Sequence, residues 1–112
     1  MFDRIREWAL NRGIYNKSDS FAQYTKLMEE NGELGEALMR RDKDEIVDAI
    51  GDMVVVLTNI AHLEGFHIED CIESSYSVIS KRKGSIVNGV FVKQNNFFVN
   101  VFFSILQYDT IQ

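Results

Sequence analysis

Apolar side chains recur every three or four residues along most of the chain, which is the spacing of an amphipathic helix. The first helix should stop at Gly13, and residues 16–20 should form a polar loop. The C-terminal half of the third predicted helix, residues 43–64, is apolar nearly all round, so we expect it to form the buried centre of a four-helix bundle. In the fourth segment Ile72, Tyr76 and Ile79 should face inward. The four predicted helices cover residues 2–12, 20–41, 43–64 and 68–80.

Beyond the fourth helix the pattern changes. Asn88 and Gly89 stand between β-branched and aromatic residues, which is a strong signal for a two-stranded hairpin. The stretch over 94–112 is apolar and nearly without charge. We therefore expect an all-α domain over 1–93 that ends in a short hairpin, followed by an apolar extension whose role the sequence leaves open.

Composition narrows the classes of function. A net charge of -5 argues against a nucleic acid polymer as partner, because that needs a basic footprint. The single cysteine, Cys71, excludes an internal disulfide framework and suits a reducing cytoplasm, where we expect it to be a small buried residue. The N-terminus lacks the apolar core of a signal peptide, and the longest apolar runs fall short of the ~20 residues that span a bilayer. We expect a cytoplasmic protein without membrane contact.

Acidic residues are concentrated in two patches on consecutive predicted helices. Like charges three or four residues apart destabilise a helix by a few tenths of a kcal/mol per pair. A divalent cation would turn that repulsion into attraction. The patches are Glu29-Glu30-x-x-Glu33-x-x-Glu36 and Glu45-x-x-Asp48-x-x-x-Asp52.

A short connection between the two helices should make them antiparallel neighbours, so that their patches face each other. They then supply about three to five oxygen ligands, the hard set that Mg²⁺ or Mn²⁺ prefers. No histidine or cysteine stands within the patches, so zinc is not expected. The candidate ligands are Glu30, Glu33, Glu45, Asp48 and Asp52.

The simpler alternative is a solvated acidic helix face. Three glycines weigh against it, because each costs about 1 kcal/mol inside a helix relative to alanine and suggests a close approach of backbone or ligand. Asp48 and Asp52 also begin the most apolar helix, where an acid without a partner is costly. The glycines are Gly32, Gly35 and Gly51.

Both patches resemble motifs of the MazG-type nucleoside triphosphate pyrophosphohydrolases, an all-α group. Lys26–Ala37 resembles the Glu-x-x-Glu helix of that family, and Asp48–Leu57 resembles its Glu-x-x-Asp helix. The similarity runs from the first residue to about 93 and is typical of short, phage-type members. Ala49 stands where many members have Glu, so Asp48 or Glu45 replaces that ligand, or the site binds metal more weakly or holds fewer ions.

The resemblance implies a homodimer or homotetramer that hydrolyses a (d)NTP to its monophosphate and pyrophosphate with Mg²⁺, or Mn²⁺. It implies that Glu33 or Glu36 accepts the proton of the attacking water. It also suggests phosphate contacts for Lys26, Lys81 and Lys83, and base or sugar contacts for Trp8, Gln23 and Asn59.

Each of these residues has a structural alternative. Trp8 suits a core or an interface, Asn59 suits a buried backbone partner, and Lys26 suits an ion pair with Glu30. For the whole chain, two other functions stay open. One is hydrolysis of dUTP or an alarmone on the same fold. The other is a non-catalytic nucleotide- or metal-binding module that lost turnover through Ala49.

Overall fold

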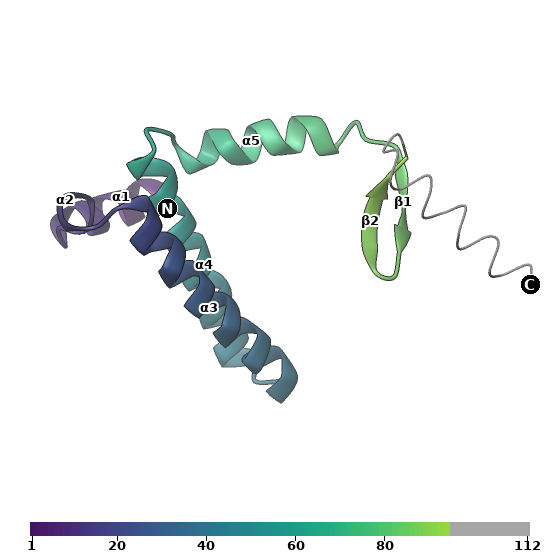
Figure 1. Cartoon of the computed structure of the whole chain (residues 1–112), viewed down its shortest axis with the longest axis horizontal. Coiled ribbons are helices and arrows are strands. Elements are labelled where there is room, and N and C mark those ends of the chain that lie inside the picture. The colour runs from purple at the N-terminus through teal and green to yellow at the C-terminus, as the bar shows by residue number, and fades with distance from the viewer. Residues whose placement is uncertain (95–112) are drawn as a thin grey trace, which may run out of the picture. The chain divides into compact units, whose positions relative to one another are not determined.

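The computed structural model describes residues 1–94. The predicted extension over 94–112 therefore lies, except for Gln94, outside the described residues. The chain divides into two compact units, Met1–Glu73 and the part from Ser74 onward. Figure 1 traces the elements in chain order, which are α1 (Phe2–Asn11), α2 (Ile14–Lys17), α3 (Ser20–Arg40), α4 (Lys43–Leu63), α5 (Ile68–Ile79), β1 (Gly84–Val87) and β2 (Val90–Lys93).

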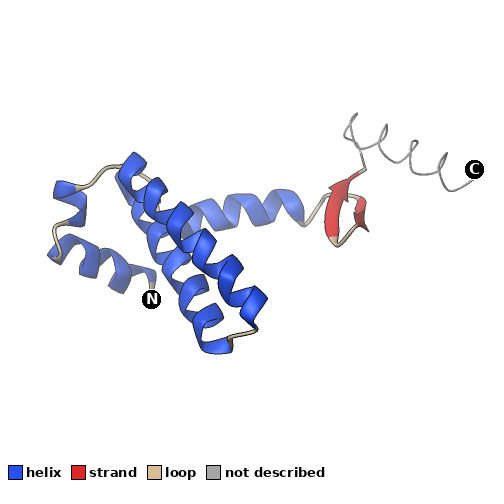
Figure 2. Ribbon diagram, turned by 60° about the horizontal axis from the view of Figure 1, so that its bottom comes forward, coloured by secondary structure: helices blue, strands red, loops and turns tan. Residues whose placement is uncertain are grey.

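Side-chain caps explain where the two long helices begin. Asp19 accepts a hydrogen bond of 2.7 Å from the backbone N–H of Ala22 and starts α3. Asp42 accepts one of 3.2 Å from the N–H of Glu45 and starts α4. Arg41 closes α3 in the left-handed conformation. Because the connection is so short, α3 and α4 form the predicted antiparallel pair, which Figure 2 shows side by side.

The core of the first unit is small. α4 packs against α3 and also against α1. Four of the five buried apolar residues are alanines, and three polar residues are buried as well. Small side chains let helix backbones approach closely but bury little apolar area. The buried residues are Ala9, Ala37, Ala49, Val56 and Ala61, with Glu30, Thr58 and Asn59.

The described residues form five helices where the sequence predicted four. The additional helix is the single turn α2, which includes the first two residues of the predicted polar loop, Asn16 and Lys17. Its N-cap is Gly13, whose φ of 79° places it in the left-handed region. Gly13 therefore ends α1, as predicted, but also redirects the chain into a new turn.

The prediction that the C-terminal half of α4 is a buried centre holds only in part. Val56, Asn59 and Ala61 are buried there, but Val54 is 37% exposed and Leu57 is 40% exposed. The residues predicted to face inward on α5, including Tyr76, are also exposed, and so is Cys71. The hydrophobic period identifies an apolar face but not what covers it, and the described residues of one chain leave these faces open.

α4 also bears on the expectation about membranes. By length and composition alone it could cross a bilayer, so the expectation that every apolar run is too short was wrong. This is weak evidence for a membrane span, because the core helix of a soluble protein passes the same test. Asp48 and Asp52 would also be costly in lipid. The absence of membrane contact stays a prediction.

The predicted hairpin is confirmed. β1 and β2 pair antiparallel, with Val87 opposite Val90. Asn88 and Gly89 have φ angles of 50° and 79°, as a turn that needs two left-handed residues requires. At the far end of the hairpin a Cβ on Gly84 would lie 2.1 Å from a backbone oxygen, so only glycine fits.

Candidate active site

Glu30 is the most deeply buried acid of the described chain, at 4% exposure. Its Oε1 lies 3.3 Å from the Lys26 ammonium, one turn earlier on α3. Its Oε2 is buried without a hydrogen-bond partner among residues 1–94. A buried carboxylate oxygen left in this way is costly unless a cation or donor satisfies it. Glu30 thus has the environment of an incomplete ion site.

Asp52, on α4, and Glu30, on α3, both line a pocket that is described below. Burial raises the pKa of Asp52, and the negative charges of Asp48 and Glu30 raise it further. The two helices therefore bring acidic groups together in a partly desolvated place. A divalent cation would offset both the repulsion and the desolvation.

Lys26 pairs with two acids at once. Its Nζ lies 3.4 Å from Glu29 as well as 3.3 Å from Glu30, and the hydrogen bond to Glu30, then that to Glu29, raises the pKa of Lys26. The predicted ion pair with Glu30 is thus observed. Lys26 also lines the pocket and remains half exposed. Its ammonium can therefore meet an anion that enters there.

The pocket lined by α1, α2, α3 and α4, called here the central pocket, has a volume of ≈ 490 Å³. It brings together Trp8, Gln23, Lys26 and Asn59, the substrate-contact candidates that lie in the first unit. Polar and apolar side chains both contribute to the wall, as in most small-molecule sites. The remaining lining residues are Ile14, Glu30, Asp52, Val55 and Val56.

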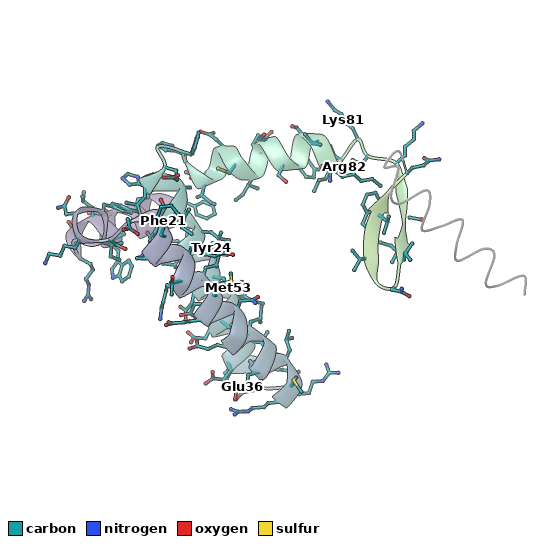
Figure 3. All side chains as sticks on the ribbon, viewed as in Figure 1. Phe21, Tyr24, Glu36, Met53, Lys81 and Arg82 are labelled. Atoms are coloured by element: carbon teal, nitrogen blue, oxygen red, sulfur yellow. The ribbon has the colours of Figure 1, made fainter. Side chains whose placement is uncertain are left out.

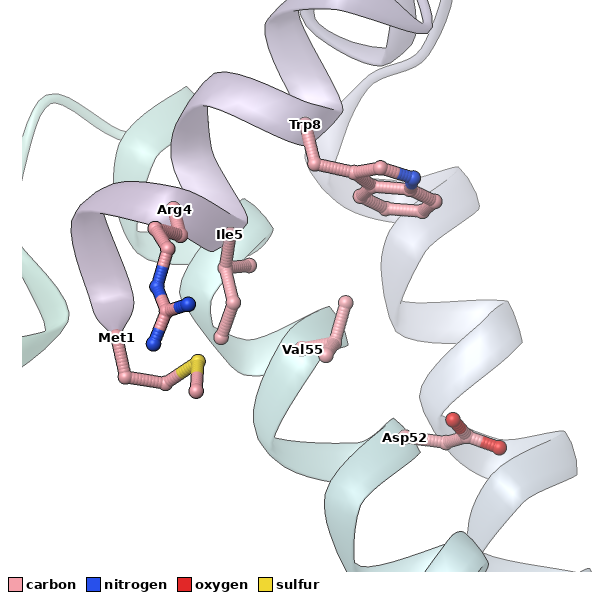
Figure 4. A pocket seen from close by; sticks show the side chains of 6 residues that line it. All are labelled: Met1, Arg4, Ile5, Trp8, Asp52 and Val55. Carbon is pink, nitrogen blue, oxygen red and sulfur yellow. The ribbon is translucent and has the colours of Figure 1, made fainter.

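A second hollow of ≈ 370 Å³ adjoins the central pocket, since Trp8, Asp52 and Val55 line both. Figure 4 shows its wall, with the Trp8 ring and the Asp52 carboxylate on either side of Val55. Arg4 also lines it and was not among the predicted residues. Its position one turn before Trp8 on an amphipathic helix was the only sequence signal for it.

A chain of side-chain hydrogen bonds runs along one wall of the central pocket. The Tyr15 hydroxyl donates to Asn59 Oδ1 at 3.1 Å, and Asn59 Nδ2 donates to Gln23 Oε1 at 3.4 Å. Gln23 Nε2 then donates to Ser18 Oγ at 3.1 Å. The Tyr15 ring stacks on His62 with centroids 4.0 Å apart. Asn59 thus hydrogen-bonds side chains, in contrast to the backbone partner considered from the sequence.

Several predicted site residues are not drawn together. Glu33, Glu45 and Asp48 are exposed, and Glu36 forms an ion pair with Arg40. Within residues 1–94 no three acidic, histidine or cysteine side chains are arranged as a metal site. Of these exposed acids, Asp48 acts on Asp52, because its negative charge helps to raise the pKa of Asp52.

The remaining candidates and the three helix glycines give a mixed result. Lys81 and Lys83 are exposed residues of the second unit, and their phosphate contacts stay a prediction. A Cβ on Gly32, Gly35 or Gly51 would meet nothing within 4 Å. The close approach that these glycines suggested is therefore not made within the described chain.

Comparison with known proteins agrees with the sequence motifs. Residues 19–87 match the family model of the MazG nucleotide pyrophosphohydrolase domain, and the chain belongs to this family. It is 36% identical over 73 residues to an uncharacterized 18.2 kDa protein of the rep-hol intergenic region of Haemophilus phage HP1. That alignment covers 65% of this chain and 44% of the relative, so the chain spans less than half the relative's length. No solved structure matches.

Proposed function

We propose that this protein hydrolyses nucleoside triphosphates to the monophosphate and pyrophosphate with the help of a divalent cation. Membership of the MazG family suggests nucleotide pyrophosphohydrolysis as the reaction class. The observation that carries the proposal for this chain is the buried, unpartnered oxygen of Glu30 in a pocket shared with Asp52 and Lys26. Carboxylates and an ammonium in one pocket suit a substrate that arrives as a metal–phosphate complex.

The residues present fit Mg²⁺, with Mn²⁺ as the alternative. Glu30 and Asp52 would hold the ion, because one has an unsatisfied oxygen and the other a pKa raised by burial and neighbouring charge. Asp48 and Glu33, each about one turn from these acids, would assist, whereas Glu45 lies about 10 Å from Asp52 along α4 and is the more distant candidate. When bound, the ion would neutralise phosphate charge and lower the pKa of the attacking water.

The chain's own side chains then have separate tasks. Lys26 binds a phosphate oxygen while it stays paired with Glu30. Glu33 is the better candidate to take the proton of the attacking water, because Glu36 is engaged by Arg40. The central pocket excludes water from the reacting phosphate and holds the nucleoside through Trp8 and the amide side chains.

We also propose that the protein works as a homodimer or homotetramer. On α3 an apolar and glycine stripe lies opposite Glu30, and a second stripe runs along α4. Phe21 is 84% exposed and Met39 is 88% exposed, and Figure 3 labels Phe21 and Tyr24 on α3. Apolar patches of this extent on a soluble protein usually mark an interface. The stripes are Phe21, Tyr24, Met28, Gly32, Gly35 and Met39, and Val47, Ile50, Val54 and Leu57.

The non-catalytic alternative rests on one observation. Ala49, at the expected ligand position, is a buried core residue at 4% exposure. The chain thus has an apolar contact where many relatives are expected to have a carboxylate.

A cytoplasmic location remains part of the proposal.

The test is pyrophosphate release by the purified protein with Mg²⁺ or Mn²⁺ over canonical and modified dNTPs, dUTP and an alarmone. Glu30→Gln should lower the rate at least about a hundredfold, the upper end of the loss when a ligand's supporting partner is removed. Glu29→Gln is the matched control, since Glu29 also pairs with Lys26 but does not line the pocket. Nucleotide binding without release from any substrate would favour the non-catalytic module.

A further inference from the structure

The hydrogen-bond chain from Tyr15 to Ser18 has a fixed direction. The Ser18 hydroxyl donates to the carbonyl oxygen of Asp19, so its oxygen accepts from Gln23 Nε2. Gln23 Oε1 then accepts from Asn59 Nδ2, and Asn59 Oδ1 accepts from the Tyr15 hydroxyl. Burial raises the pKa of Tyr15, so the phenol keeps its proton and remains a donor at neutral pH. The donor Tyr15 at one end and the acceptor Ser18 at the other therefore fix which way the side-chain amides of Asn59 and Gln23 are turned.

This arrangement leaves each amide with one unused N–H. The side-chain oxygens of Asn59 and Gln23 each accept one hydrogen bond. Each side-chain NH₂ group donates one of its two hydrogens to a neighbouring side chain. Asn59 is only 2% exposed, and both side chains line the central pocket. A ligand that fills the pocket is therefore expected to offer acceptors, because a buried N–H left unpaired is costly, whereas each side-chain oxygen already accepts one hydrogen bond.

The position of the two amides decides which part of a nucleotide they meet. Asn59 and Asp52 are seven residues apart on α4, hence on one face and about 10 Å apart along the axis. That is the length of a nucleoside with its first phosphate. With the phosphates at Glu30 and Asp52, as in the proposed function, the amides lie at the far end of the base. The groups there are the 4-substituent of a pyrimidine and the 6-substituent of a purine.

We propose that the Asn59–Gln23 pair selects nucleotides whose base has a keto group at this position, namely uracil, thymine, guanine and hypoxanthine. An amino group, as in cytosine and adenine, would place its own hydrogens against the two amide N–H groups. Tyr15 and Ser18 are positioning residues for this selection, since they hold the amide oxygens away from the ligand. The inference rests on the proposed function for the direction of the bound nucleotide.

The test uses Trp8, the only tryptophan of the chain and a residue of the pocket wall. Its fluorescence is followed while the full-length protein with Mg²⁺ is titrated with dGMP, dAMP, dUMP or dCMP. These are products and not substrates, so binding is measured apart from turnover. We expect dGMP to bind about tenfold more tightly than dAMP, and dUMP than dCMP, as one or two hydrogen bonds lost from a buried site imply.

Two variants separate selection from structure. Tyr15→Phe keeps the ring on His62 but frees the Asn59 oxygen, so both affinity ratios should fall to about one to threefold. Asn59→Asp replaces N–H groups by acceptors and should favour the amino bases. Tyr76→Phe, an exposed tyrosine of α5, is the matched control and should leave both ratios unchanged.

The outcomes are distinct for the two proposals. Equal or reversed affinities within both pairs, or no binding of any of the four nucleotides, would overturn the inference. So would Tyr15→Phe with unaltered ratios in a folded protein. Pyrophosphate release without base preference would leave the proposed function standing and reject only the selection, whereas keto preference without turnover would do the reverse.

Discussion

Arg6 on α1 donates hydrogen bonds of 2.6 Å to both carboxylate oxygens of Glu69, at the start of α5. Arg6 also contacts Asp3 at 2.6 Å, and its side chain is only 11% exposed. A two-pronged guanidinium–carboxylate pair is stronger and more directional than a single contact. It fixes α1, which carries Trp8, to the rest of the first unit.

Glu69→Gln should therefore lower the thermal stability of the protein at neutral pH. The Arg6 hydrogen bonds, followed by a backbone hydrogen bond, lower the pKa of Glu69 from 4.5 to about 2. An acid whose pKa falls on folding adds stability above its unfolded pKa, and this contribution is lost as the pH drops from 4.5 towards about 2. Circular dichroism melts across that window should show the variant and the parent converge. Asp3→Asn, which alters the exposed partner, should change the melts far less.

Asp52→Asn should stabilise the metal-free protein at neutral pH while it abolishes pyrophosphate release. The pKa of Asp52 is raised above 3.8 on folding, so its contribution is present below that pH and is lost as the pH rises through the raised pKa. Asparagine carries no charge, so the variant does not lose this stability at neutral pH. Each kcal/mol gained in the free energy of unfolding raises Tm by about 4–8 °C in a domain of this size. Melts in EDTA at several pH values measure the effect. Added Mg²⁺ should stabilise the parent but not the variant, and an equal response of both would reject Asp52 as a ligand.

Lys26→Gln should raise KM for nucleoside triphosphates by about tenfold or more, because hydrogen bonds to charged groups contribute more than neutral ones. Lys26→Arg keeps the charge and should retain most of the affinity. Steady-state pyrophosphate release over a range of substrate concentrations gives KM and kcat separately. Unchanged KM in both variants would restrict Lys26 to its ion pairs with Glu29 and Glu30.

Met28→Asp should dissociate the proposed oligomer. The residue lies in the middle of the exposed stripe of α3, where a carboxylate would be desolvated without a partner if a second chain packs there. Light scattering coupled to gel filtration gives the mass of each species. Ala22→Asp places the same charge on α3 away from the stripe and should leave the mass unchanged. A parent protein that runs as a monomer at micromolar concentration would contradict the proposal directly.

The two long helices and the hairpin were predictable because their signals are local. Asp19 and Asp42 cap helices within three residues of themselves, and Asn88-Gly89 defines its turn without help from the rest of the chain. The pairing of Glu30 with Asp52 was also foreseen, since a short connection leaves two helices little choice but to be neighbours.

What the sequence missed depends on rotation and distance. Spacing along α3 groups Glu33 with Glu30, but it does not say which of the two turns toward α4, and only Glu30 does so fully. The contact of Tyr15 with Asn59 joins residues 44 positions apart, so no local pattern announces it. The exposure of Tyr76 likewise shows that a period of 3.6 residues identifies the apolar face of a helix but not what packs against that face.

The carboxylates Glu30 and Asp52 stand inside the 19–87 segment that matches the family model, whereas Trp8, Tyr15 and Ser18 precede it. The pocket is thus assembled from two stretches of chain, one inside the segment that matches the family model and one before it. Substitutions in the first eighteen residues can reshape the aromatic wall and the orienting hydroxyls without disturbing the acids. We expect that exchanging this leading segment between relatives would alter the proposed choice of nucleotide while the acids of the proposed hydrolytic site stay in place.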